Sequence, residues 1–156
     1  MGFREDLEQD QVSSLALRDA IIVRSDTTIK EAVGLMREKS LGCAVIVDQS
    51  GTASGIFTEQ SLLAALSRQE GLDDQTVGDF SDPSFLSLPS SAPISRVWDA
   101  IEEDGLRFIC VTGDDGQLIG VTGQRGIFEY LAECFPQQVL VQRLGSKPWM
   151  KQREGA

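Results

Sequence analysis

The stretch GIFTEQS, residues 55–61, has the composition of a turn from a buried strand into a helix. An offset of 65 residues (120 − 55) separates it from GVTGQRG, residues 120–126, which opens in the same way and ends differently. In both stretches a glycine directly precedes an apolar residue, and an apolar segment of helical character follows. A turn that is written twice at a fixed spacing indicates that the chain contains two copies of one structural unit.

The sequence around the two turns supports this interpretation, because residues 20–66 align with residues 85–131 without a gap. Identical residues are few, but the apolar pattern is shared. Each copy has four apolar residues at positions i, i+3, i+4 and i+7, which form one face of a helix. These residues are Ile29, Ala32, Val33 and Met36 in the first copy and Ile94, Val97, Trp98 and Ile101 in the second.

Each copy predicts the same order of elements: strand, helix, strand, strand, helix. The predicted buried strands are apolar runs bounded by turn residues. In the first copy the strands are expected at 20–23, 43–47 and 52–57, and in the second at 85–88, 108–111 and 117–121. A unit of about 45 residues is too small to bury a core alone, so we expect the two copies to pack against each other. The fold class is therefore α/β, of the α+β type.

The remaining residues divide the chain further. We expect an N-terminal amphipathic helix at 1–17, the first repeat at 18–69, the second at 70–134, and a C-terminal segment and tail at 135–156. A polar, turn-rich connection at 71–82 is expected to contain one short helical turn. Within the C-terminal segment we expect apolar residues 139–144 to dock and polar residues 151–156 to stay mobile.

Composition limits the classes of function. The formal net charge is −10 and no basic patch is visible, so we expect no nucleic-acid binding. No apolar run has the length of about 20 residues that a membrane span needs, and the first residues do not have the pattern of a secretory signal, so a cytoplasmic protein with reduced cysteines is expected. The chain has no histidine, and no nucleophile or phosphate-loop motif is present. We therefore expect neither an enzyme nor a metal site.

The duplicated order of elements and the two turns resemble a tandem pair of CBS domains, known as a Bateman module. In that family the turn reads Gly, two apolar residues, Thr or Ser, two variable residues and Asp. Here Gly55 and Thr58 match this motif, whereas Ser61 stands at the Asp position. In the second copy Gly123 and Gly126 replace the hydroxyl and carboxylate residues of the motif. The resemblance implies two repeats that pack with pseudo-two-fold symmetry.

The resemblance also implies a ligand and the residues that hold it. Family members bind adenosine-containing ligands, so AMP, ADP or ATP is expected in a cleft between the repeats. The hydroxyl of Thr58 would contact a phosphate at a helix N-terminus, Ser61 would contact the ribose, and arginines would face the phosphate. The predicted ligand-binding residues are Gly55, Phe57, Thr58, Ser61, Ile21, Ile22, Val23, Gly42, Cys43, Ala44, Ser87, Arg107, Ile109 and Arg125.

Because Gly123 and Gly126 have no polar side chains, the sequence predicts that only the cleft around Thr58 serves a nucleotide. Three possibilities remain open at this point. The first is a regulatory module that senses a nucleotide and signals to a partner protein. The second is a dimerisation or interaction scaffold with degenerate nucleotide sites, and the third is a different ligand that needs no ribose contact. In each case we expect a homodimer through the helices that carry Leu62, Leu66, Phe128, Tyr130 and Leu131, because large apolar patches are rarely left exposed.

Overall fold

The computed structural model describes residues 3–82 and 84–134, and it contains two units with the same order of elements. The first unit consists of β1 (Ile22–Val23), α2 (Ile29–Lys39), β2 (Cys43–Val47), β3 (Ala53–Thr58) and α3 (Glu59–Leu66). The second consists of β4 (Ser87–Pro89), α4 (Ile94–Glu102), β5 (Phe108–Thr112), β6 (Leu118–Gly123) and α5 (Gln124–Cys134). The 3₁₀ helix η2 (Val77–Phe80) lies in the connection between them, where the sequence predicted a helical turn. The predicted order of elements is confirmed.

The two sheets have the same topology. In each, a short first strand pairs in parallel with the second, and the second pairs antiparallel with the third, which gives the orders β1-β2-β3 and β4-β5-β6. The pairing shifts between Ile46 and Val47 in the first sheet and between Val111 and Thr112 in the second. These two irregularities are 65 residues apart, as are the two turns, so the repeat extends to the strand register.

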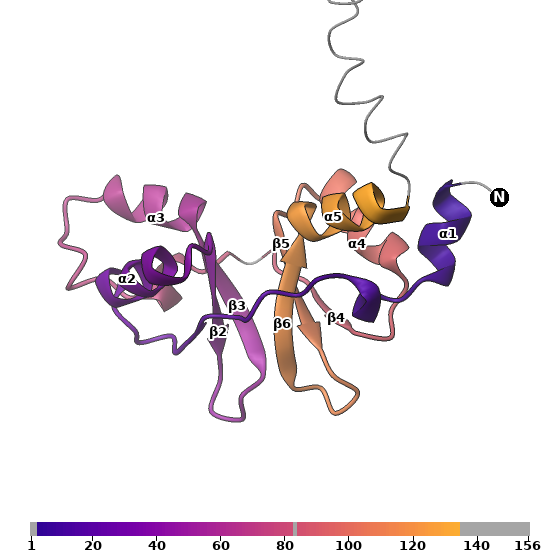
Figure 1. The fold of residues 1–156 in the computed structure, drawn as a ribbon. Helices are drawn as coiled ribbons and strands as arrows, with labels where there is room; N and C mark the ends of the chain where they lie inside the picture. Colours follow the sequence, from indigo (N-terminus) through magenta and orange to yellow (C-terminus); the bar gives the residue numbers. More distant parts are fainter. Residues whose placement is uncertain (1–2, 83, 135–156) are drawn as a thin grey trace, which may run out of the picture.

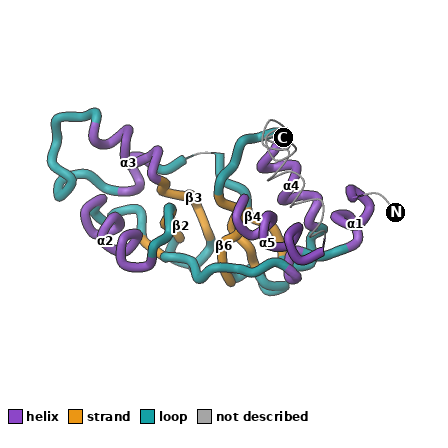
Figure 2. Tube along the Cα trace, turned by 45° about the horizontal axis from the view of Figure 1, so that its top comes forward, coloured by secondary structure: helices purple, strands orange, loops and turns teal. Residues whose placement is uncertain are grey.

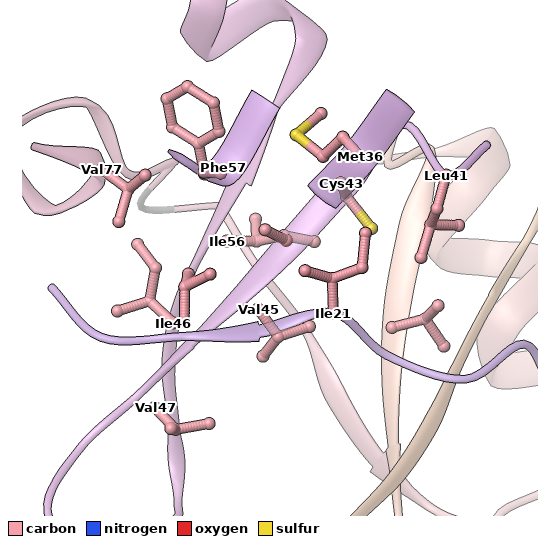
Figure 3. Packing of buried hydrophobic residues seen from close by; sticks show 14 of the residues in the cluster. Ile21, Met36, Leu41, Cys43, Val45, Ile46, Val47, Ile56, Phe57 and Val77 are labelled. Atoms are coloured by element: carbon pink, nitrogen blue, oxygen red, sulfur yellow. The ribbon is translucent and has the colours of Figure 1, made fainter. Parts of the chain in front are cut away.

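The sheets lie side by side in the centre of the molecule, and the helices cover their outer sides (Figure 1). Helices α2 and α3 belong to one end, and α4, α5 and α1 belong to the other (Figure 2). The two halves also share a core, since Cys110 and Val121 of the second unit belong to the apolar cluster of the first. In that cluster Val45, Ile46 and Phe57 are almost fully buried (Figure 3). This packing is what a unit too small to form its own core requires.

The N-terminal segment completes the second unit, not the first. Leu7, Val12 and Leu15 are buried in the core of the second unit, and α1 (Phe3–Gln9) packs against α4. The sequence predicted one helix across residues 1–17, but α1 ends at Gln9 and a 3₁₀ turn, η1, follows at Val12–Ser14. The helix ends early because the next backbone N–H groups donate to carbonyls near α4: Val12 to Ala92 at 2.8 Å and Ser13 to Ser90 at 2.9 Å.

The segment before the first strand of each unit crosses to the third strand of the other unit. Arg18 and Val121 exchange two backbone hydrogen bonds of 2.9 Å each, and Asp82 donates its N–H to the carbonyl of Ile56 at 2.7 Å. We call these crossing segments the straps: residues 16–18 form the first strap, and residues 82 and 84 are described in the second. Because the straps cross, each space between the units is lined by residues from both.

The helical surface differs in part from the one expected for a dimer. Leu63, Leu66 and Phe128 are exposed by 67%, 55% and 40%. Tyr130 was predicted to belong to this surface, but it is buried and its hydroxyl donates to a carboxylate oxygen of Asp10. Homodimerisation stays a prediction. Among the described helices none is long and apolar enough to cross a membrane, and residues 139–144 and 151–156, for which docking and mobility were predicted, lie outside the described part of the chain.

Candidate functional site

Two clefts lie between the units, and the 65-residue repeat relates them. The larger has a volume of about 550 Å³ and the smaller about 60 Å³. Each is lined by one strap, by the residues before a middle strand, and by the turn from a third strand into a helix. The larger cleft is lined by Ala16, Leu17, Arg18, Leu41, Gly42, Glu59, Arg107, Phe108, Val121, Thr122, Gly123, Gln124, Arg125, Gly126 and Glu129. The smaller is lined by Ile56, Thr58, Gln60, Asp82, Ser84, Gly105, Leu106, Arg107 and Phe108.

The difference in volume follows from the residues at equivalent positions. Gly42 lines the larger cleft, and its equivalent at an offset of 65 is Arg107, which lines the smaller one. Gly123 in the larger cleft is likewise equivalent to Thr58 in the smaller. Two positions of the larger cleft are thus glycine where the smaller cleft has an arginine and a threonine. Small-molecule sites have volumes of roughly 300–1,000 Å³, so only the larger of these two clefts has the size for a nucleotide.

At the first turn the polar side chains cap helix α3. The Thr58 hydroxyl accepts from the backbone N–H of Ser61 at 3.3 Å, and the Ser61 hydroxyl accepts from the N–H of Thr58 at 3.1 Å. This reciprocal pair is a capping box, which satisfies two backbone donors that a helix start otherwise leaves without partners. Ser61 is 7% exposed and does not line either cleft. Ser61, which was predicted to contact a ribose, therefore caps the N-terminus of α3.

At the second turn no such cap is available, because Gly123 has no side chain. A Cβ atom at Gly123 would lie 2.0 Å from the carbonyl oxygen of Arg107, and a Cβ atom at Gly126 would lie 2.3 Å from the hydroxyl of Thr122. Close packing against backbone therefore requires glycine at position 123, whereas at position 126 the Thr122 side chain would have to move. The N-terminus of α5 lines the larger cleft without a side-chain cap from residue 123, so its first backbone N–H groups are available to an anion. The buried Thr122 hydroxyl has no hydrogen-bond partner within the described residues.

Three arginines and two glutamates line the larger cleft, a net charge of +1 (3 − 2), although the whole chain carries −10. The arginines are Arg18, Arg107 and Arg125. Arg18 donates to the carbonyl of Lys39 at 3.1 Å. The other two arginines form ion pairs with carboxylates that also line the cleft, Arg107 with Glu59 at 3.6 Å and Arg125 with Glu129 at 3.3 Å. All four of these side chains are well exposed, and such exposed pairs are worth only about 0–1 kcal/mol each, so an anionic ligand can displace them.

The structure separates the predicted ligand-binding residues into three groups. Gly42, Arg107 and Arg125 line the larger cleft, and Thr58 and Arg107 line the smaller one. Several others belong to the buried core and line neither cleft; these are Ile21, Val23, Cys43, Ala44, Gly55, Phe57 and Ile109. Ile22 and Ser87 are exposed on short strands and also line neither cleft. The predicted cleft around Thr58 is thus the narrow one, because Arg107 and the capped turn occupy its walls.

Sequence reasoning missed the first strap, Ala16 to Arg18, and the residues Glu59 and Phe108. The strap lines the cleft only because it crosses to β6, and no local pattern reports such a crossing. For Glu59 there was a signal, since it follows Thr58 directly in the first turn. Within residues 3–82 and 84–134, no group of cysteine and carboxylate side chains is arranged to hold a metal ion.

Comparison with known proteins shows the family and the fold. A family model for the CBS domain matches residues 12–68 and again residues 77–133. An uncharacterized 17.7 kDa protein of Acidianus ambivalens is 24% identical over 128 residues, which cover 82% of this chain and 77% of the relative.

Two solved structures share the fold. The first is a CBS domain protein from Pyrobaculum aerophilum complexed with AMP, with 18% identity, coverage of 85% of this chain and 97% of that chain, and a TM-score of 0.70. The second is a CBS domain pair in complex with 5′-methylthioadenosine and S-adenosyl-L-methionine, with 18% identity, coverage of 80% and 97%, and a TM-score of 0.69.

Proposed function

Because the chain belongs to the CBS-domain family, we propose that it is a regulatory module that binds an adenosine-containing ligand, of the AMP, ADP or ATP type, and signals to a partner protein. The ligand occupies the larger cleft, at the second turn, and not the cleft around Thr58. The observation that carries this proposal is the unequal size of the two equivalent clefts, about 550 Å³ against about 60 Å³. Structural relatives with AMP and with S-adenosyl-L-methionine support the class of ligand.

The polar groups of the larger cleft suit a phosphate. The N-terminus of α5 offers backbone N–H groups and the positive end of the helix dipole. Arg125, in the first turn of the same helix, adds a guanidinium, and Arg18 adds another from the first strap. Guanidinium groups bind phosphate through paired, charge-assisted hydrogen bonds. These groups take the place of the Thr or Ser hydroxyl that the family motif supplies and that Gly123 lacks.

The strap provides a route for the signal. Arg18 is hydrogen-bonded to β6 on one side and to the end of α2 on the other, so a ligand at this residue contacts both units at once. A bound ligand brings the first strap, α5 and the end of α2 closer together. This movement changes the surface that binds a partner protein. A ligand shifts such an equilibrium only by its difference in affinity for the two arrangements.

Titration calorimetry and thermal unfolding test the proposal with AMP, ADP, ATP and S-adenosyl-L-methionine. At 100 times its Kd a ligand should stabilise the protein by about 2.7 kcal/mol, which corresponds to roughly 5–10 °C for a chain of this size. Gly42→Leu should abolish binding, since a Cβ there meets only the tip of the Phe108 ring at 3.0 Å and the Glu59 carboxylate at 3.3 Å, and the longer side chain then fills the cleft.

Thr58→Ala is the matched variant in the smaller cleft, and it should change the ligand affinity by less than about twofold while costing about 1 kcal/mol of stability through the lost cap. If Thr58→Ala loses ligand binding and Gly42→Leu keeps it, the ligand binds in the cleft around Thr58 and not in the larger one. If none of the four ligands binds at millimolar concentration, the regulatory proposal fails and the interaction scaffold replaces it.

A further inference from the structure

One wall of the larger cleft brings together an aromatic ring, a residue without a side chain and a carboxylate. Because Gly42 has no side chain, the end of the Phe108 ring packs close to it: a Cβ atom there would lie 3.0 Å from Cζ of Phe108. The same position is 3.3 Å from Oε1 of Glu59. A flat ring can lie against this wall, because the Phe108 side chain that lines the cleft offers it an apolar contact.

The carboxylate of Glu59 lies on this wall of the cleft. Glu59 is the first residue of α3, in the first unit, and it reaches the cleft that the second turn forms. Its Oε2 atom pairs with Nη1 of Arg107 at 3.6 Å, whereas it is Oε1 that lies toward Gly42. An ionised carboxylate only accepts hydrogen bonds, so a ligand group beside Oε1 must be a donor.

Building on the proposed function, we propose that Glu59 determines base specificity by accepting a hydrogen bond from the exocyclic amino group of adenine. The amino group of adenine is a donor, whereas guanine and hypoxanthine have a carbonyl oxygen at the equivalent position. A carbonyl oxygen placed beside Oε1 would repel it. Arg107, which is paired with the same carboxylate, can donate to the neighbouring ring nitrogen. Glu59 and Arg107 therefore present an acceptor and a donor side by side, which matches the edge of adenine.

The size of the effect follows from the loss of a charge-assisted hydrogen bond. A site that forms a hydrogen bond with one polar group of its ligand binds analogues that lack this group much more weakly. Replacing the amino donor by a carbonyl oxygen should weaken binding about tenfold to a hundredfold. Wild-type protein should thus bind AMP at least tenfold more tightly than inosine monophosphate, whose base has a carbonyl oxygen in place of the amino group and a hydrogen on the neighbouring ring nitrogen.

Titration calorimetry of AMP and inosine monophosphate against wild type, Glu59→Gln and Glu129→Gln tests the inference. The glutamine amide both donates and accepts, so Glu59→Gln should bring the ratio of the two affinities close to one. Glu129→Gln removes the same charge from the other carboxylate that lines the cleft, and it should shift both affinities alike and leave the ratio unchanged. Glu59 is 61% exposed, and the unfolding temperature of each variant shows whether the fold is kept.

Two results would overturn the role of Glu59 while leaving the proposed function in place. One is a wild-type ratio near one. The other is a Glu59→Gln variant that binds both nucleotides more tightly by the same factor, because Glu59 would then act only through its negative charge. Failure of wild type to bind either nucleotide at millimolar concentration, with the protein folded, would refute the proposed function and the inference together.

Discussion

Replacing Gly123 by alanine should destabilise the protein strongly, although the change adds one methyl group. Gly123 ends β6 and pairs with Phe108 of β5, and its absent Cβ lies 2.0 Å from the carbonyl oxygen of Arg107. Real Cβ contacts are essentially never shorter than 3.0 Å, so the two strands must separate there by at least 1.0 Å (3.0 − 2.0). The obstacle is backbone and not a flexible side chain, so the strain cannot be relieved by a rotamer change.

We expect a loss of about 2–4 kcal/mol in the free energy of unfolding. Overpacking of this kind typically costs about 1–3 kcal/mol, and the end of the β5–β6 ladder adds about 1 kcal/mol for a weakened hydrogen bond. For a chain of this size each kcal/mol shifts the melting temperature by about 2–4 °C, so we expect a decrease of roughly 10 °C. Urea unfolding followed by circular dichroism gives the free energy directly.

Gly34→Ala is the matched control, since Gly34 lies in the exposed middle of α2 and no heavy atom outside its own helix is within 4 Å of its absent Cβ. Alanine there should stabilise the protein by about 0.5–1 kcal/mol, because glycine is the poorer helix former. If Gly123→Ala stays within about 0.5 kcal/mol of wild type, close backbone packing is not the reason for glycine at the second turn.

Three further predictions concern the rest of the molecule. Tyr130→Phe should lower the free energy of unfolding by about 1.5 kcal/mol, because burial and the bond to the Asp10 carboxylate raise the pKa of the hydroxyl and keep it a donor; urea unfolding of the variant measures this. Iodoacetamide at pH 8 should modify Cys134 in the folded protein but all three cysteines in urea, because burial raises the pKa of Cys43 to about 12 and of Cys110 to about 11; mass spectrometry counts the adducts. Sedimentation should give a dimer, twice 17.0 kDa, through α3 and α5, and a 17.0 kDa species at micromolar concentration would contradict it.

Much of the fold was predictable because it follows from local apolar patterns, and these patterns occur in both repeats. The apolar stripe that begins at Ile29 and the one that begins at Ile94 each form a helix that packs on its own sheet. The straps were not predictable in this way. The pairing of Arg18 with Val121 joins residues about a hundred positions apart, and it depends on how the two finished units dock. The end of α1 at Gln9 has the same cause, since backbone bonds to the second unit replace those of a longer helix.

The candidate site was less predictable than the fold. A sequence motif shows which polar side chains are present, but it does not show which cleft is wide enough for a ligand. Thr58 and Ser61 kept hydroxyl groups, so the sequence favoured the first turn. In the structure those hydroxyls satisfy the start of α3. The sequence predicted no nucleotide at Gly123 and Gly126, because neither has a polar side chain. In the structure both residues line the cleft that has room for a nucleotide.

The contrast between Gly42 and Arg107 accounts for one open cleft and one narrow one in a molecule whose two halves share a fold. The glycine leaves space in the larger cleft, and at the equivalent position of the smaller cleft stands an arginine. Arg107 lines both clefts, and it is also paired with Glu59 of the other unit. A ligand that accepts a hydrogen bond from Arg107 in the larger cleft therefore also acts on a wall of the smaller one. Under the proposed function, Arg107 is thus the contact through which occupancy of the larger cleft can reach both units.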